Sequence, residues 1–74
     1  MAKLKIVTSV AMCRLIENIG FVAIRQRGSH KFYRHNDGRT TVIPMHAKDL
    51  DRSLIRKILR DIEISIEEFN NLLS

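Results

Sequence analysis

The sequence contains few of the residues that cross-link a fold or build a cofactor pocket. Its 74 residues include one cysteine, one proline, three glycines and no tryptophan. A single cysteine cannot form an internal disulfide, so packing alone must hold the fold, which suits the reducing cytoplasm. Three widely separated glycines do not make a glycine-rich phosphate loop, so we expect no nucleotide and no other small-molecule cofactor.

Long apolar runs are also missing. No stretch approaches the roughly 18 apolar residues of a membrane-spanning helix, and the first residues do not follow the pattern of a signal peptide. A chain of 74 residues has room for one small hydrophobic core. We therefore expect a single domain over residues 1–74 that works in the cytoplasm and makes no contact with a membrane.

Positive charge is present in excess. Thirteen Lys and Arg against eight Asp and Glu give a formal net charge of +5, which favours polyanionic partners, most commonly nucleic acid. The charge is unevenly spread, because residues 25–39 contain a single acid, Asp37, whereas the C-terminal segment is acidic. The basic residues of this stretch are Arg25, Arg27, Lys31, Arg34 and Arg39. A polyanion is therefore expected to dock on the middle of the chain.

Hydrophobic periodicity predicts a first helix over residues 9–19. Thr8 or Ser9 can cap its N-terminus, and Gly20 supplies the left-handed residue that commonly follows a helix. Its apolar stripe has the spacing i, i+3, i+4 and i+7. The stripe consists of Met12, Leu15, Ile16 and Ile19.

Two more helices are predicted near the end of the chain. Asp51 or Ser53 can cap the second, which has the strongest amphipathic pattern in the sequence. Its apolar face contains Leu54, Ile55, Ile58, Leu59 and Ile62. The third helix is short and begins at Ser65, because Ser65 and Glu68 have the spacing of a capping box.

The middle of the chain predicts strands over residues 21–26, 30–35 and 40–44. Asp37-Gly38 is typical of a tight hairpin turn, and Pro44 should end the third strand because it has no N–H to donate. Residues 46–50 are then a loop. The order αβββα, with a terminal helix, predicts an α+β fold in which helices cover one face of a three-stranded antiparallel sheet. The other face is expected to be open to solvent.

Few residues can support catalysis by a nucleophile or a metal. Cys13 lies on a predicted helix without a partner and is interpreted as a small buried hydrophobe, and no serine follows the Gly-x-Ser-x-Gly pattern. His30 and His35 differ by an odd number of positions, so their rings lie on opposite faces of a regular strand. With no Cys-x-x-Cys and no paired carboxylates, we expect no metal site.

His30 is the remaining candidate for chemistry. It follows Gly28-Ser29 at the entry to the second strand, among cations. An imidazole that titrates near neutrality can take the proton from a ribose 2′-OH, and nearby cations can stabilise charge on phosphorus. His30 is therefore expected to act as a general base or a general acid in RNA cleavage. The candidates for RNA contact are Arg25, Arg27, Gly28, Ser29, Lys31 and Arg34.

Each of these interpretations has a plainer alternative. A histidine at a strand start is often only a surface residue, and a basic sheet face is often only solvated. If His30 is exposed, alternation exposes Phe32 and buries Tyr33. For His46, a hydrogen-bonded structural role is favoured over one that supports the site.

The ordered motifs resemble the HicA toxins of bacterial and archaeal toxin–antitoxin pairs, also called YcfA-like proteins. The matching motifs are Gly20-Phe21-Val22, Arg25-Gln26, Gly28-Ser29-His30, Arg34-His35, Asp37-Gly38-Arg39, Val42-Ile43-Pro44, His46, residues 54–59 and Ile64-Ser65 with Glu67-Glu68-Phe69. The resemblance spans about residues 8–73. Asn36 and Arg52 stand where many relatives have Pro and Gly, and neither lies in the Gly-Ser-His run.

The resemblance implies a fold like that of double-stranded RNA-binding domains. It implies an endoribonuclease that cleaves mRNA and stops translation until a HicB-type antitoxin binds it. It also implies one essential histidine, which falls on His30, with no metal. Two rivals are a non-catalytic RNA-binding module that uses the same basic face, and a protein-interaction or DNA-binding adaptor.

Overall fold

The computed structural model describes residues 3–46 and 48–73. Its elements are α1 (Ser9–Asn18), β1 (Val22–Arg27), β2 (His30–Arg34), β3 (Thr40–Pro44), α2 (Arg52–Ile62) and α3 (Ile66–Leu73). The predicted αβββα order with a short terminal helix is confirmed. The first strand begins one residue later than predicted, at Val22. The predicted loop over residues 46–50 includes residue 47, which lies outside the described residues.

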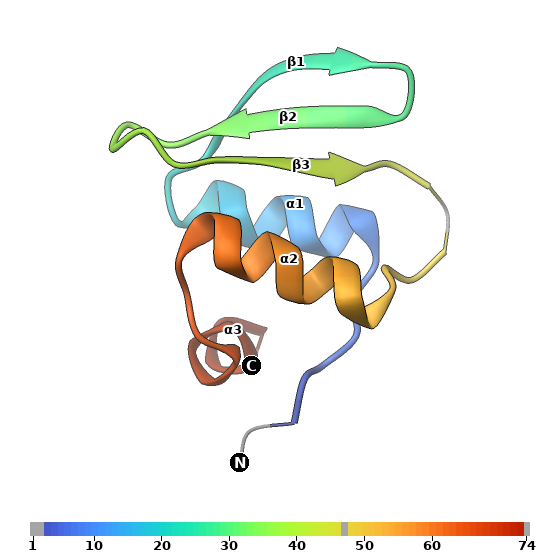
Figure 1. The fold of residues 1–74 in the computed structure, drawn as a ribbon, viewed down its shortest axis with the longest axis vertical. Coiled ribbons are helices and arrows are strands. Elements are labelled where there is room, and N and C mark those ends of the chain that lie inside the picture. The colour runs from blue at the N-terminus through green and yellow to red at the C-terminus, as the bar shows by residue number, and fades with distance from the viewer. Residues whose placement is uncertain (1–2, 47, 74) are drawn as a thin grey trace.

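The fold has two layers (Figure 1). The three strands form an antiparallel sheet in the order β1-β2-β3. Helices α1 and α2 lie side by side against one face of the sheet, and α3 lies beyond them. The opposite face of the sheet is open, so the predicted α+β fold is confirmed. Within residues 3–46 and 48–73, no helix is long and apolar enough to cross a membrane.

Local signals explain where α1 begins and which side it buries. Thr8 is the N-cap, and its hydroxyl accepts a hydrogen bond from the backbone N–H of Ala11 at 3.2 Å. The alternative cap, Ser9, is instead the first helical residue and is fully buried. The predicted stripe packs into the core, with Met12 and Ile16 fully buried.

The C-terminal helices also follow their predicted caps. Asp51 accepts a hydrogen bond from the N–H of Ser53 at 3.2 Å, and Ser65 accepts one from the N–H of Glu68 at 3.0 Å. The buried face of α2 is formed by Ile55, Ile58, Leu59 and Ile62. Phe69 of α3 is fully buried beneath it.

The segment that precedes α1 ties the two helical N-termini together. The N–H of Leu50 donates to the carbonyl of Val7 at 2.8 Å, and Thr8 forms a bridge with Asp49. Since α2 begins directly after this segment, α1 and α2 start at the same end of the molecule (Figure 1). Both helices therefore run in the same direction beneath the sheet.

Alternation along β2 decides which side chains face the helices. Tyr33 is fully buried, and its hydroxyl donates to Glu17 of α1 at 2.5 Å. Burial and hydrogen bonds with Cys13 and Glu17 raise the pKa of the Tyr33 phenol. His30 is exposed and Phe32 is half-buried, as residues on the open face. The predicted burial of Tyr33 is confirmed.

Candidate nucleic-acid interface

The register of the sheet defines the open face. Three rows of directly paired residues lie on it, one at each end of the strands and one between them. These rows are Arg27, His30 and Pro44; Arg25, Phe32 and Val42; and Val22, Arg34 and Thr40. We call the surface formed by these nine residues the open face. It contains Arg25, Arg27 and Arg34 and no acid, so it attracts polyanions.

An aromatic ring lies among these cations. The guanidinium of Arg25 lies over the ring of Phe32, at 4.6 Å from the ring centroid, a distance typical of a cation–π contact. A β-bulge between Ala23 and Arg25 shifts the register of β1. The bulge places Arg25 and Arg27 on the same side as Val22, although alternation alone would separate them.

His30 stands at the edge of this face, beside the turn that joins β1 and β2. Its side chain is exposed, and its ring has no hydrogen-bond partner among residues 3–46 and 48–73. Gly28 takes a positive φ of 57° in the turn, and a Cβ added there would meet no atom within 4 Å. The space above the turn is therefore open to a ligand. Ser29 is also exposed, and its carbonyl accepts from the N–H of Met45.

Lys31 is separated from His30 by the alternation of the strand. Its ammonium lies 5.6 Å from the ring centroid of Tyr33, on the side of the helices, and its side chain is half-buried. Lys31, Arg27 and Arg34 are all predicted from the sequence to contact RNA. The structure brings Arg27 and Arg34 to the open face and leaves Lys31 on the other face.

Arg39, the fifth basic residue of the segment, has a structural role. Its Nε donates to both carboxylate oxygens of Asp37, at 3.0 and 2.8 Å, and its Nη1 donates to the carbonyl of Ile62 at the end of α2. The hydrogen bonds from Arg39 lower the pKa of Asp37. Arg39 therefore joins the β2–β3 turn to α2.

His35, at the opposite end of β2 from His30, is also structural. Its Nδ1 accepts from the N–H of Asp37 at 3.1 Å, which leaves the proton on Nε2 to donate to the carbonyl of Ile19 at 3.1 Å. Its ring packs edge-on against Phe21, with 5.1 Å between ring centroids. Gly20 leaves room for this ring, because a Cβ at Gly20 would lie 2.8 Å from Nε2.

His46 corrects one expectation. Its side chain is exposed, and its ring makes no hydrogen bond within the part of the chain that the structure describes. Only its backbone is held, by a bond from its N–H to the hydroxyl of Ser9 at 3.4 Å. The favoured role as a hydrogen-bonded structural ring is therefore wrong, because the side chain is exposed to solvent and not held by the fold.

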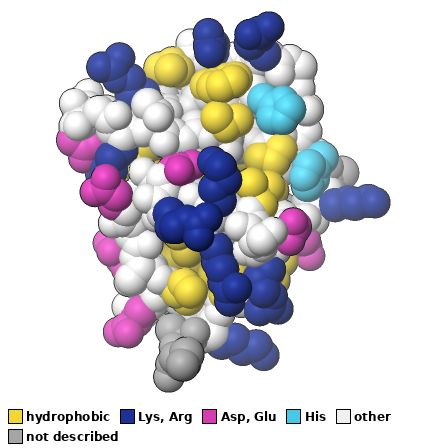
Figure 2. Space-filling model, in the orientation of Figure 1, with side chains coloured by type: hydrophobic (Ala, Val, Ile, Leu, Met, Phe, Trp, Pro, Cys, Tyr) yellow, Lys and Arg dark blue, Asp and Glu magenta, His cyan; other side chains and the backbone are white. Residues whose placement is uncertain are grey.

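The electrostatics of the His30 end are set by more than its side chains. Helices α1 and α2 both start there, and each helix N-terminus carries roughly +0.5 of an elementary charge from its aligned peptide dipoles. Figure 2 shows histidine side chains (cyan) beside Lys and Arg (dark blue) at the end where Figure 1 places the β1–β2 turn and the β3–α2 loop. The N-terminus of α1 has no acid in its first turn, whereas the carboxylate of Asp51 caps α2 and offsets its positive end.

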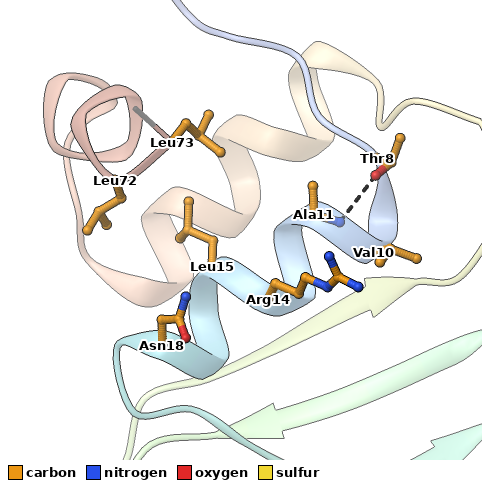
Figure 3. Close-up of a pocket in the computed structure, with 8 residues that line it drawn as sticks. All are labelled: Thr8, Val10, Ala11, Arg14, Leu15, Asn18, Leu72 and Leu73. Carbon is orange, nitrogen blue, oxygen red and sulfur yellow. Dashed lines mark hydrogen bonds between the residues drawn. The ribbon is translucent and has the colours of Figure 1, made fainter.

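A groove elsewhere on the surface offers less chemistry. It runs between α1 and α3, and Figure 3 shows Val10, Leu15 and Leu72 around it. Arg14 is the one charged side chain among the residues that line it, and they include no histidine, carboxylate or cysteine. We therefore place the candidate site on the open face.

Metal ligands do not gather in the described residues. No group of three or more His, Cys, Asp or Glu side chains lies together within residues 3–46 and 48–73. Cys13 is buried, with its Sγ 3.6 Å from the Sδ of Met45. Its interpretation as a small buried hydrophobe is confirmed.

Ser9 is the residue of this region that the sequence analysis missed. Its hydroxyl donates to the carbonyl of Pro44 at 2.6 Å and accepts from the N–H of His46. It thereby fixes the end of β3 next to His30. In the sequence, Ser9 is distinguished only as a polar residue at the start of a predicted helix. That position is interpreted as a helix cap.

Comparison with known proteins identifies the family of the chain. A comparison with curated proteins gives no match. The family described as "HicA toxin of bacterial toxin-antitoxin" matches residues 11–64. That span contains the whole sheet, its open face and most of the two helices beneath it. The chain therefore belongs to the HicA toxin family, which makes it the toxin of a toxin–antitoxin system with an antitoxin as its partner.

Proposed function

We propose that this toxin is a metal-independent endoribonuclease that cleaves mRNA on its open face, with His30 as the general base. The observation that carries the proposal is the exposed, unpartnered ring of His30 in a row with Arg27. A general base must be free to reach its substrate. Of the three histidines, only His30 is a strand residue of the open face.

The remaining groups of the face support binding. We propose that Arg25, Arg27 and Arg34 contact phosphates of the RNA. Their position in three different rows of one surface supports this proposal. The Phe32 ring beneath Arg25 offers a surface on which a base or guanidinium can stack. Gly28 and Ser29 leave exposed backbone in the turn for a close approach of the ribose-phosphate chain.

The expected products follow from the chemistry of one imidazole. His30 can activate the internal 2′-OH more readily than it can position a separate water, since the 2′-OH is already attached next to the phosphorus. Cleavage should therefore leave a 2′,3′-cyclic phosphate and a 5′-hydroxyl. Recovery of 5′-phosphate ends alone would refute this route.

The proposed partner is a HicB-type antitoxin, and the proposed place of action is the cytoplasm, where mRNA is translated. Family membership supplies the antitoxin role. Co-expression with the neighbouring small reading frame should restore growth to cells that produce the toxin. Continued growth arrest despite stable expression of that protein would count against the pairing.

Purified protein, RNA and excess chelator test the proposal against a non-catalytic RNA-binding module. We expect the RNA to be cut at undiminished rate, because no step in the proposal uses a metal. An RNA that is bound but stays intact would instead favour the binding module. The buffer control without protein measures spontaneous hydrolysis.

A competition experiment addresses the adaptor alternative. Duplex DNA should compete poorly for the open face, since the proposal requires single-stranded RNA with an accessible 2′-OH. Equal or better competition by duplex DNA would favour a DNA-binding adaptor. The same competition with an RNA of equal length provides the reference.

A further inference from the structure

His46 stands next to His30 in the extended register of the sheet. His30 is directly paired with Pro44, and the N–H of Met45 donates to the carbonyl of Ser29. One hydrogen bond therefore joins the chain just after β3 to the β1–β2 turn, although residues 45 and 46 lie outside the strand. His46 occupies the diagonal position to His30, two residues beyond Pro44, and diagonal neighbours lie about 7–8 Å apart.

Both rings lie on the same side of the sheet. Met45 faces the helices, because its Sδ lies 3.6 Å from the Sγ of Cys13 in α1. Successive side chains of an extended chain point to opposite faces. His46 therefore points to the open side, as His30 does, and both side chains are exposed.

Ser9 fixes the backbone that carries His46. Its hydroxyl donates to the carbonyl of Pro44 at 2.6 Å and accepts from the N–H of His46 at 3.4 Å. In an extended chain the carbonyl of Pro44 and the N–H of His46 point to the same edge, so one hydroxyl can bridge them. Ser9 is itself fully buried, so the core of the fold holds the hydroxyl in this position.

The reaction proposed above includes a second proton transfer, to the leaving oxygen. Attack of O2′ on phosphorus breaks the P–O5′ bond, and the attacking and leaving oxygens lie on opposite sides of the phosphorus. One imidazole removes the proton from O2′, and a second group that donates a proton to O5′ as it leaves would accelerate the reaction beyond what water achieves. Two histidines at diagonal positions, with Cα atoms about 7–8 Å apart, have a suitable spacing for their imidazoles to flank one phosphate.

We propose that His46 is the general acid of the cleavage reaction, an inference that rests on the proposed function. The imidazole of His30 accepts the proton of the 2′-OH while O2′ forms a bond to phosphorus. The imidazolium of His46 gives its proton to O5′ as the P–O5′ bond breaks. Proton exchange with water then returns both rings to their starting states. No oxidant, reductant or other reactant is needed.

The test uses a substrate in which sulfur replaces O5′ at one cleavage site. A thiolate leaves without protonation, so the sulfur substrate does not need a general acid. His46→Ala should cleave ordinary RNA about 10²-fold or more slowly than wild type, yet cleave the sulfur substrate at close to the wild-type rate. His30→Ala should be slow on both substrates. His46→Gln should behave as His46→Ala.

The pH profile gives a second readout. A base and an acid together produce a rate that falls on both sides of an optimum. His46→Ala should lose the fall on the alkaline side, and His30→Ala the fall on the acid side. Melting temperatures should match wild type for both variants, because both rings are exposed.

Three outcomes overturn the inference. Wild-type rates for His46→Ala on ordinary RNA would leave His30 as the cleaving residue and remove His46 from the reaction. An equal loss on both substrates would assign His46 to RNA binding rather than proton donation. Absence of cleavage by the wild-type protein would overturn the proposed function and this inference with it.

Discussion

The two ends of β2 carry the same residue type in opposite conditions. His35, at the turn between β2 and β3, is half-buried and uses both ring nitrogens in hydrogen bonds to Asp37 and Ile19. His30, at the other end, is exposed and has no ring partner among residues 3–46 and 48–73. A ring whose nitrogens are occupied stabilises the fold, whereas a free ring is available to a substrate. The surroundings of each histidine, and not its residue type, determine whether its ring is structural or available to a substrate.

The same contrast extends to the cations near each end. Arg39, beside His35, is bonded to Asp37 and to the end of α2. Arg27, beside His30, is exposed on a face without acids. One end of the sheet is held together by its charged groups, and the other presents them to solvent.

The largest effect is expected from His30→Ala in cells. Because positioned proton transfer contributes about 10² to 10⁴ in rate, this variant should permit growth when induced, whereas the wild-type protein should arrest it. Protein levels measured on the same cells control for expression. Growth arrest by a well-expressed His30→Ala protein would show that toxicity does not depend on this ring.

Gly20→Ala should be the most destabilising change at the His35 end. Gly20 has a φ of 104°, and the added Cβ would lie 2.8 Å from the ring of His35. Gly38→Ala is the matched control, because Gly38 has a φ of 98° and nothing within 4 Å of an added Cβ. Backbone strain alone costs about 1–3 kcal/mol, and Gly20→Ala should exceed Gly38→Ala.

Urea unfolding of the two glycine variants measures this difference in free energy. Adding His35→Ala to Gly20→Ala should remove the steric part of the loss, so the two substitutions should be non-additive. Equal losses for Gly20→Ala and Gly38→Ala would mean that His35 does not pack against Gly20 as described.

Arg27→Ala and Lys31→Ala should separate the two faces of the sheet. Each phosphate contact changes the slope of log affinity against log salt by about 0.7 for single strands. Arg27→Ala should reduce the slope of RNA binding by that amount. Lys31→Ala should leave the slope unchanged, because its ammonium lies over Tyr33 on the helix side.

Binding titrations at several salt concentrations, with His30→Ala in the background to prevent cleavage, provide the measurement. A reduced slope for Lys31→Ala would restore the expectation from the sequence that Lys31 contacts phosphate. An unchanged slope for Arg27→Ala would remove the open face from the binding surface.

The smallest effect is expected from Asp37→Asn. Hydrogen bonds from Arg39 lower the pKa of Asp37 below its ordinary value in the folded protein. The carboxylate therefore stabilises the fold above that ordinary value, and the effect is lost as pH falls through the folded pKa. Asp37→Asn should slightly lower the melting temperature at neutral pH, and the difference from wild type should vanish in acid. A difference that persists in strong acid would contradict this assignment.

Much of the fold could be predicted because its signals are local. The caps at Thr8, Asp51 and Ser65 and the periodic apolar faces of the helices specify their positions within a few residues. The hairpin turns follow from Asp37-Gly38 and Gly28-Ser29. These signals need only neighbours in the sequence.

The details of the candidate site depended on pairing between distant segments. Alternation along β2 was enough to separate Phe32 from Tyr33, and the same rule separates Lys31 from His30. The bulge that brings Arg25 to the open face forms only against β2. The position of His46 depends on Ser9, which lies 37 residues earlier in the sequence, so no local signal predicts it.

The most direct test compares single-turnover cleavage of one RNA by three proteins in excess chelator. The wild-type protein should cleave it. Folded His30→Ala should be slower by about 10² to 10⁴ at an unchanged melting temperature. His35→Ala should melt at a lower temperature yet cleave at close to the wild-type rate while folded. Cleavage by His30→Ala at the wild-type rate would contradict the account.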